Sequence, residues 1–68
     1  MTKDSHMLGV LFSFYRIGNS TKITAIDEVS HCEVSVIAPS TLSQIDMERL
    51  ALRKLQRMIQ QSSHVHLS

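Results

Sequence analysis

The chain has few of the residues that mark specialised classes of protein. Its 68 residues include one cysteine, one proline, two glycines and no tryptophan. A single cysteine excludes an internal disulfide framework, and no glycine-rich phosphate loop is present. No apolar run reaches about 18 residues, so the sequence predicts no membrane-spanning helix and no membrane partner. Seven basic and six acidic residues leave a net charge of +1, which argues against a basic nucleic-acid arm or an acidic tail.

What the chain does contain is enough apolar material for one small core. The apolar fraction of 43% is typical of a globular protein. In a domain below roughly 70–80 residues, however, a single hydrophobic core rarely contributes more than about 3–5 kcal/mol to the free energy of unfolding. We therefore expect a partner to support it. Because Cys32 has no second cysteine to pair with, we also expect a reducing compartment and a cytoplasmic protein.

Three segments have the composition of β-strands. Residues 10–17 are rich in aromatic and β-branched side chains, and residues 22–27 alternate between polar and apolar. Residues 32–38 form a third apolar segment that ends at Pro39, which cannot donate to a sheet ladder. Only short polar stretches separate the three segments, and short connections predict antiparallel hairpins. The predicted sheet is a three-stranded antiparallel β-meander.

A helix follows the third strand. Ser43 is a favourable N-cap and Asp46 places an acid in the first turn. From there to residue 60 the chain has neither glycine nor proline, and its apolar residues recur on one arc. A helix of about 19 residues, at about 1.5 Å per residue, spans roughly 28 Å. It is long enough to cover one face of the sheet, but one helix cannot cover both faces. The fold class is α+β, with the C-terminal helix packed on one sheet face.

The two ends of the chain carry little structural signal. Residues 1–6 are polar and end like the remnant of a cloning site, and the C-terminal tail has no helical period. We therefore expect a single βββα domain over residues 8–61, with flexible ends at 1–7 and 62–68.

Alternation along the strands divides the apolar side chains between two sheet faces. One face carries Phe12, Phe14, Ile23, Ala25, Val34 and Val36. The other face carries Leu11, Tyr15, Ile17, Ile26 and Ile37, mixed with Ser13, Thr24 and Ser35. Because one helix cannot cover this second face, we expect a non-enzymatic protein-interaction module, a homodimer through the free sheet face or edge, with another protein as a further possible partner. Leu50, on the polar side of the helix, joins the second set as a candidate interface residue.

A basic stripe on the helix supports an alternative function. Arg49, Arg53 and Arg57 recur every four residues, and Lys54 lies beside them. Such a stripe can grip phosphates along a nucleic acid. It also has a simpler interpretation as a solvated face whose positive charge suits the helix C-terminus. A small nucleic-acid-binding protein is therefore the second hypothesis.

One acid interrupts the apolar arc of the helix. Glu48 fits the edge of the packed face near the helix N-terminus, and a buried ion pair with Arg16 or Lys22 is the alternative.

No set of residues converges for catalysis. Cys32 and His31 are neighbours, and neighbours in a strand point to opposite faces, so they do not form a nucleophile–base pair. His64 and His66 could bind a metal, but a stable zinc site needs about four ligands. We expect no enzyme, no cofactor and no metal.

Four segments resemble a known family. Residues 14–19, 22–27, 33–39 and 50–55 are similar to a small family of bacterial proteins of unknown function found in alphaproteobacteria. The resemblance spans about residues 8–60 and implies a compact strand-strand-strand-helix unit. It implies no activity and no site residues.

Overall fold

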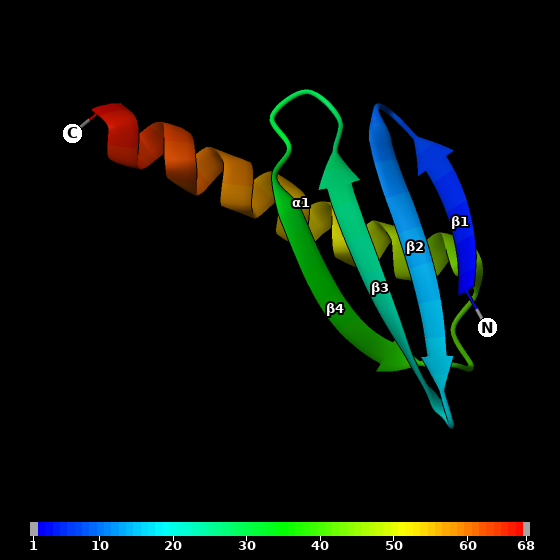
Figure 1. The fold of residues 1–68 in the computed structure, drawn as a ribbon. Helices are drawn as coiled ribbons and strands as arrows, with labels where there is room; N and C mark the ends of the chain where they lie inside the picture. Colours follow the sequence, from blue (N-terminus) through cyan, green and yellow to red (C-terminus); the bar gives the residue numbers. More distant parts are fainter. Residues whose placement is uncertain (1, 68) are drawn as a thin grey trace.

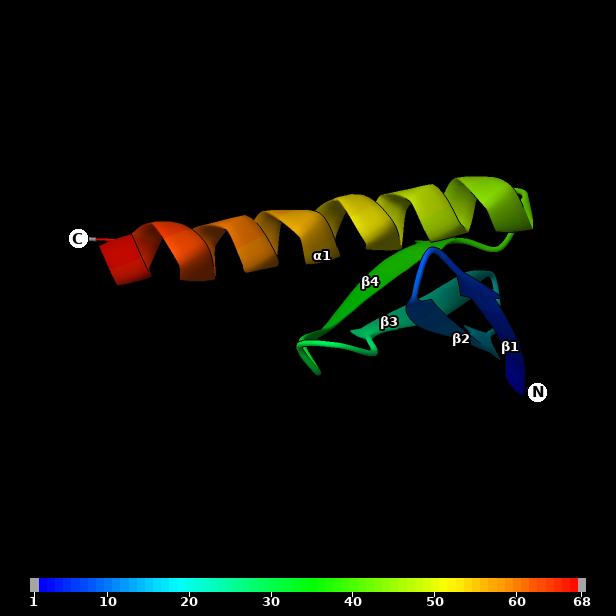
Figure 2. The same cartoon turned by 90° about the horizontal axis from the view of Figure 1, so that it is seen from above.

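The fold is a four-stranded antiparallel sheet with one helix across one of its faces (Figures 1 and 2). The computed structural model describes the backbone of residues 2–67 and the side chains of residues 4–60. The elements are β1 (Thr2–Met7), β2 (Val10–Ile17), β3 (Ser20–Asp27), β4 (Glu33–Pro39) and α1 (Gln44–Leu67). The α+β class and the single C-terminal helix are confirmed, but the predicted strand number is wrong, because there are four strands rather than three.

The additional strand is β1, at one edge of the sheet. It pairs with β2 over its whole length, from Thr2 opposite Tyr15 to Met7 opposite Val10. Leu8 and Gly9 join the two strands with φ angles of 57° and 75°. Positive φ at both positions is the mark of a type I′ hairpin turn. Sequence reasoning missed β1 because its residues are polar, and an edge strand needs few apolar side chains.

The other two connections set the register of the remaining strands. Gly18 and Asn19 form a two-residue loop, and the φ of 60° at Gly18 fits the first position of a type II′ turn. In the turn between β3 and β4, the Asp27 carboxylate accepts hydrogen bonds from the backbone N–H and the hydroxyl of Ser30, at 2.8 and 2.6 Å. His31 completes this turn with a φ of 64°.

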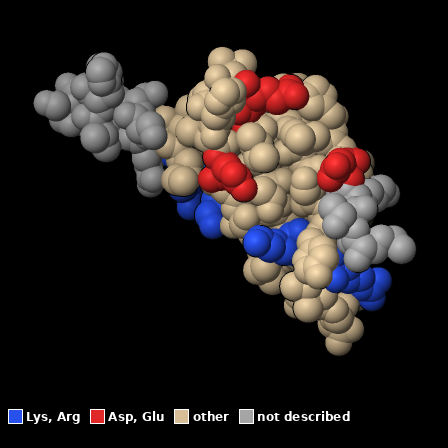
Figure 3. Space-filling model, in the orientation of Figure 1, with Lys and Arg blue, Asp and Glu red and all other residues tan. Residues whose placement is uncertain are grey.

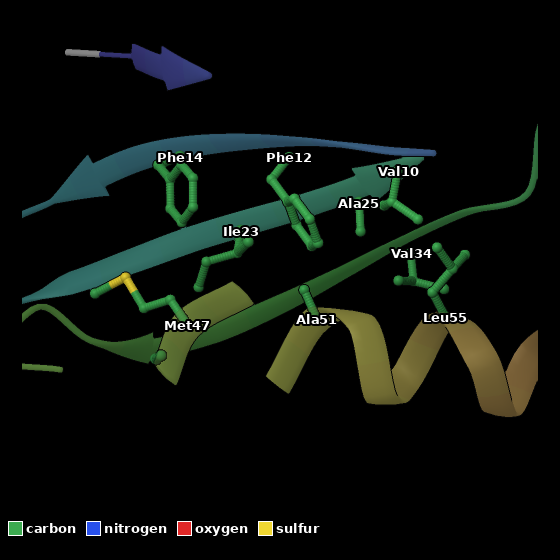
Figure 4. Packing of buried hydrophobic residues seen from close by; sticks show 10 residues of the cluster. Val10, Phe12, Phe14, Ile23, Ala25, Val34, Met47, Ala51 and Leu55 are labelled. Carbon is green, nitrogen blue, oxygen red and sulfur yellow. The ribbon is translucent and has the colours of Figure 1, made fainter. Parts of the chain in front are cut away.

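The core lies between the sheet and α1 (Figure 4). The strand registers place the alternating residues on the two faces that the sequence predicted. Phe12, Ile23 and Leu55 are the largest fully buried side chains. The other buried apolar residues are Val10, Phe14, Ala25, Val34, Ala38, Met47 and Ala51.

Helix α1 is longer than the sheet is wide. It begins as predicted, with the Ser43 hydroxyl accepting a hydrogen bond from the backbone N–H of Asp46 at 3.2 Å. It ends at Leu67 rather than near residue 60. At about 1.5 Å per residue its 24 residues span roughly 36 Å, against roughly 19 Å for four strands. The helix packs on β3 and β4, and its C-terminal part extends past the β4 edge (Figures 1 and 2).

Candidate interaction surface

The sheet face opposite α1, here called the open face, is covered by no other element in the described part of the chain. It faces the viewer in Figures 1 and 3, where the sheet stands in front of the helix. The registers assign to it the following side chains: Asp4, His6, Leu11, Ser13, Tyr15, Ile17, Ser20, Lys22, Thr24, Ile26, Glu33, Ser35, Ile37 and Pro39.

Large apolar side chains stay accessible on this face. Tyr15 is 49% exposed, Ile17 60% and Ile37 66%, whereas Leu11 and Ile26 are half-buried. Tyr15 and Ile37 flank Lys22 in one row across the strands. Burying apolar surface is favourable by about 25 cal/mol per Å², so these residues would gain from a covering partner.

Small polar side chains form the middle row of the open face. Ser13, Thr24 and Ser35 lie side by side on β2, β3 and β4. The hydroxyl oxygens of Thr24 and Ser35 are 3.1 Å apart, within hydrogen-bond distance. Because these side chains are short, and Thr24 and Ser35 are already paired with each other, a second surface can approach closely along this row.

Charge is divided between the two ends of the open face. Glu33 lies toward the β3–β4 turn and Lys22 toward the opposite end, while Asp4 lies in the middle row, opposite Ser13. Figure 3 shows the same division, with acidic side chains at one end and basic ones at the other. His6 and Glu28 meet at the acidic end, with 2.6 Å between Nε2 and Oε1. The face is therefore electrostatically asymmetric along its strands.

Leu50 does not belong to this surface. Five of the six predicted interface residues, namely Leu11, Tyr15, Ile17, Ile26 and Ile37, share the open face. Leu50 lies on α1, on the other side of the sheet, and is 41% exposed. Helical periodicity gives the angular position of Leu50 around the helix axis, but it does not tell on which side of the sheet the helix packs.

The predicted basic stripe borders a shallow groove on α1. Its volume is about 340 Å³, and it is lined by Leu50, Arg53, Lys54, Arg57 and Met58. Lys54 donates a hydrogen bond from Nζ to the backbone carbonyl of Ser35 at 2.8 Å. Arg49 lies outside this groove and faces Asp46, with 4.0 Å between Nη1 and Oδ1. Two of the four predicted cations are therefore engaged within the chain.

Glu48 is buried, and no cation pairs with it among the described side chains. It is 7% exposed and accepts hydrogen bonds from the Ser5 hydroxyl at 2.5 Å and from Gln44 Nε2 at 3.1 Å. Arg16, one of its two expected partners, donates to the carbonyl of Gly18 instead. The other, Lys22, lies on the opposite sheet face. Glu48 therefore ties β1 to α1, a role hidden from the sequence because β1 was not predicted.

The residues considered for catalysis and metal binding stay apart. Cys32 packs half-buried against the core, and His31 is exposed in the turn. No group of three or more His, Cys, Asp or Glu side chains gathers to hold a metal among the described residues. The side chains of His64 and His66 lie outside the described ones.

Comparison with known proteins identifies a family. A family described as Domain of unknown function (DUF6898) matches residues 8–62, which include β2, β3, β4 and most of α1. The match begins after β1. No curated protein and no solved structure matches the chain. Over the residues described, α1 lacks the apolar length that crossing a membrane requires.

Proposed function

The chain belongs to the DUF6898 family, whose domain has no known function, and we propose that it is a non-enzymatic protein-interaction module that forms a homodimer through its open face. One observation carries this proposal. Tyr15, Ile17 and Ile37 remain 49–66% exposed together on one sheet face, while α1 covers the other. A sheet with one covered and one apolar open face gains stability when a second layer packs on it.

The size of the open face sets the expected affinity. Neighbouring strands lie about 4.8 Å apart, and each strand rises about 3.3 Å per residue. Four strands of about seven residues therefore form a face of roughly 19 by 23 Å. Two such faces bury roughly 900 Å² in total, below the usual range of stable complexes. We therefore expect a reversible dimer with a Kd in the micromolar range.

Of the two sheet edges, β1 and β4, the β4 edge supports this dimer less well than the open face. A dimer that pairs along β4 needs free backbone groups there. The carbonyl of Ser35 already accepts a hydrogen bond from Lys54, and Pro39 has no N–H to donate. Pairing along β4 would have to displace Lys54, whereas packing on the open face breaks no hydrogen bond between elements.

Sedimentation equilibrium between about 1 and about 200 µM tests the proposal, because this range brackets a micromolar Kd. The mass should rise from 7.7 kDa toward twice that value as the concentration increases. Ile37→Asp, which places a charge in the apolar part of the face, should keep the chain monomeric. Val29→Asp is the matched control, because Val29 is 89% exposed in a turn. A single 7.7 kDa species of the unmodified chain throughout would exclude the homodimer.

A nucleic-acid-binding protein is the second candidate, because Arg53, Lys54 and Arg57 line one groove. Fluorescence polarisation with generic DNA and RNA at low salt tests it. Binding should be present, fall as salt rises, and disappear when Arg49, Arg53 and Arg57 are changed to glutamine. Absent binding, or binding that survives the triple change, would reject this candidate.

A further inference from the structure

We infer that the second copy packs on the open face with its ends reversed, so that Lys22 of each subunit meets Glu33 of the partner subunit. The inference rests on the proposed homodimer and adds the orientation of the two copies and the pair of residues that selects it. It follows from the distribution of charge along the strands.

The charges on the open face are placed symmetrically about its middle row. Lys22 shares a row with Ile37, and Glu33 shares a row with Ile26. These rows are four residues apart, roughly 13 Å at about 3.3 Å per residue. The row that contains Thr24 lies halfway between them. A two-fold axis along this middle row therefore exchanges the basic end of one subunit with the acidic end of its partner.

Two orientations of a face-to-face dimer have to be compared, because a two-fold axis can run along the strands or across them. A two-fold axis along the strands places the basic end of one copy over the basic end of the other. It therefore brings the Lys22 side chains of the two copies near each other. An axis across the strands sets each Lys22 above the partner's Ile26, one strand away from the partner's Glu33. Since like charges facing each other are unfavourable and opposite charges favourable, the second orientation is selected.

Tyr15 and the small residues of the middle row fit the same orientation, while Ile37 lies over the partner's Glu33. Tyr15 then stacks over the partner's Leu11, which shares a row with Ile26. The short side chains of the middle row meet one another at the axis, where two sheets about 10 Å apart come closest. Asp4 lies at the β1 end of that row, aligned with Ser13, and meets its own copy there. That like-charge contact lies at the sheet edge, where Asp4 is exposed to water.

Charge reversal tests the orientation separately from the existence of the dimer. Lys22→Glu and Glu33→Lys should each weaken self-association by at least about tenfold, because each creates two like-charge contacts per dimer. The double variant Lys22→Glu/Glu33→Lys restores opposite charges and should return to within about threefold of the unmodified Kd. Arg57→Glu is the control, since it makes the same charge change on α1, away from the open face.

The outcomes separate the two claims. Loss in both single variants with recovery in the double variant supports the reversed orientation. A dimer that Ile37→Asp disrupts, but that responds to Lys22→Glu no more than to Arg57→Glu, would overturn the orientation and leave the homodimer standing. A chain that stays monomeric before any substitution would overturn both. Circular dichroism of every variant confirms that the fold is intact before its association is compared.

Discussion

Truncation of Leu55 to alanine tests whether α1 holds this fold together. Leu55 is 1% exposed and belongs to the same buried cluster as Val34 of β4, beside which it appears in Figure 4. Replacing a buried leucine by alanine typically costs about 2.7–5 kcal/mol, since both transfer free energy and packing are lost. A core of this size supplies only about 3–5 kcal/mol in total. We therefore expect the Leu55→Ala chain to be largely unfolded in buffer at 25 °C.

Leu50→Ala is the matched control for this experiment. It removes the same atoms from the same helix, but Leu50 is 41% exposed, and surface substitutions usually change stability by within about 0.5 kcal/mol. Urea unfolding followed by far-ultraviolet circular dichroism compares the two. The measurement belongs at low protein concentration, because dimer formation adds apparent stability. A loss below about 1 kcal/mol for Leu55→Ala would refute the packing of α1 on the sheet, because the side chain would then have to be exposed.

Three further predictions concern β1, acid stability and one turn. Glu48→Ala leaves the Ser5 hydroxyl without its acceptor. The backbone amides of β1 should therefore exchange with deuterium faster, and the free energy of unfolding should fall by about 1–3 kcal/mol. Unchanged exchange in β1 would contradict the contact between Ser5 and Glu48. Hydrogen bonds from the side chain and backbone of Ser30 hold the pKa of Asp27 below its ordinary 3.8. The Asp27 carboxylate therefore stabilises the fold above about pH 4, and this stabilisation is lost as the pH falls through the folded-state pKa. Between about pH 5 and about pH 2, the free energy of unfolding should fall less steeply for Asp27→Asn than for the unmodified chain. Identical pH profiles of the two chains would refute this. Gly18→Ala should lower the free energy of unfolding by about 1–2 kcal/mol through the positive φ alone, because no atom lies within 4 Å of the added Cβ. Thermal melting measures this loss, and an unchanged melting temperature would contradict the positive φ at Gly18.

The alternation of the strands made most of the sheet predictable. Phe12 faces the core and Leu11 the open face because successive side chains point to opposite sides, and β2 has the predicted limits. The start of α1 was equally readable from the Ser43 cap. Its end was not, because residues 61–67 contain neither glycine nor proline to stop a helix. Strand β1 was missed because Ser5 and its neighbours are polar and stay in the sheet through backbone pairing.

The candidate surface was predictable in composition but not in arrangement. Tyr15 and Ile37 were assigned to the open face by their sequence positions. The opposition of Lys22 and Glu33 across the middle row depends on the register between β3 and β4, because a one-residue shift of β4 would move Glu33 to the other sheet face. That register is set by the turn that Asp27 and Ser30 build. Local patterns do not reveal such a relation between strands.

The chain order of the strands has a consequence for folding kinetics. Each strand pairs with its neighbour in sequence, and α1 returns to β3 and β4, the strands nearest to it along the chain. Pairing between sequence neighbours keeps the closed loops short, and domains that combine helix and sheet contacts fold at rates between those of helical bundles and those of all-β domains. The hydrogen bond from Ser5 to Glu48, by contrast, joins residues 43 positions apart. We expect the hairpins of β2, β3 and β4 with α1 to form the folding nucleus, and β1 to close over it after the rate-limiting step.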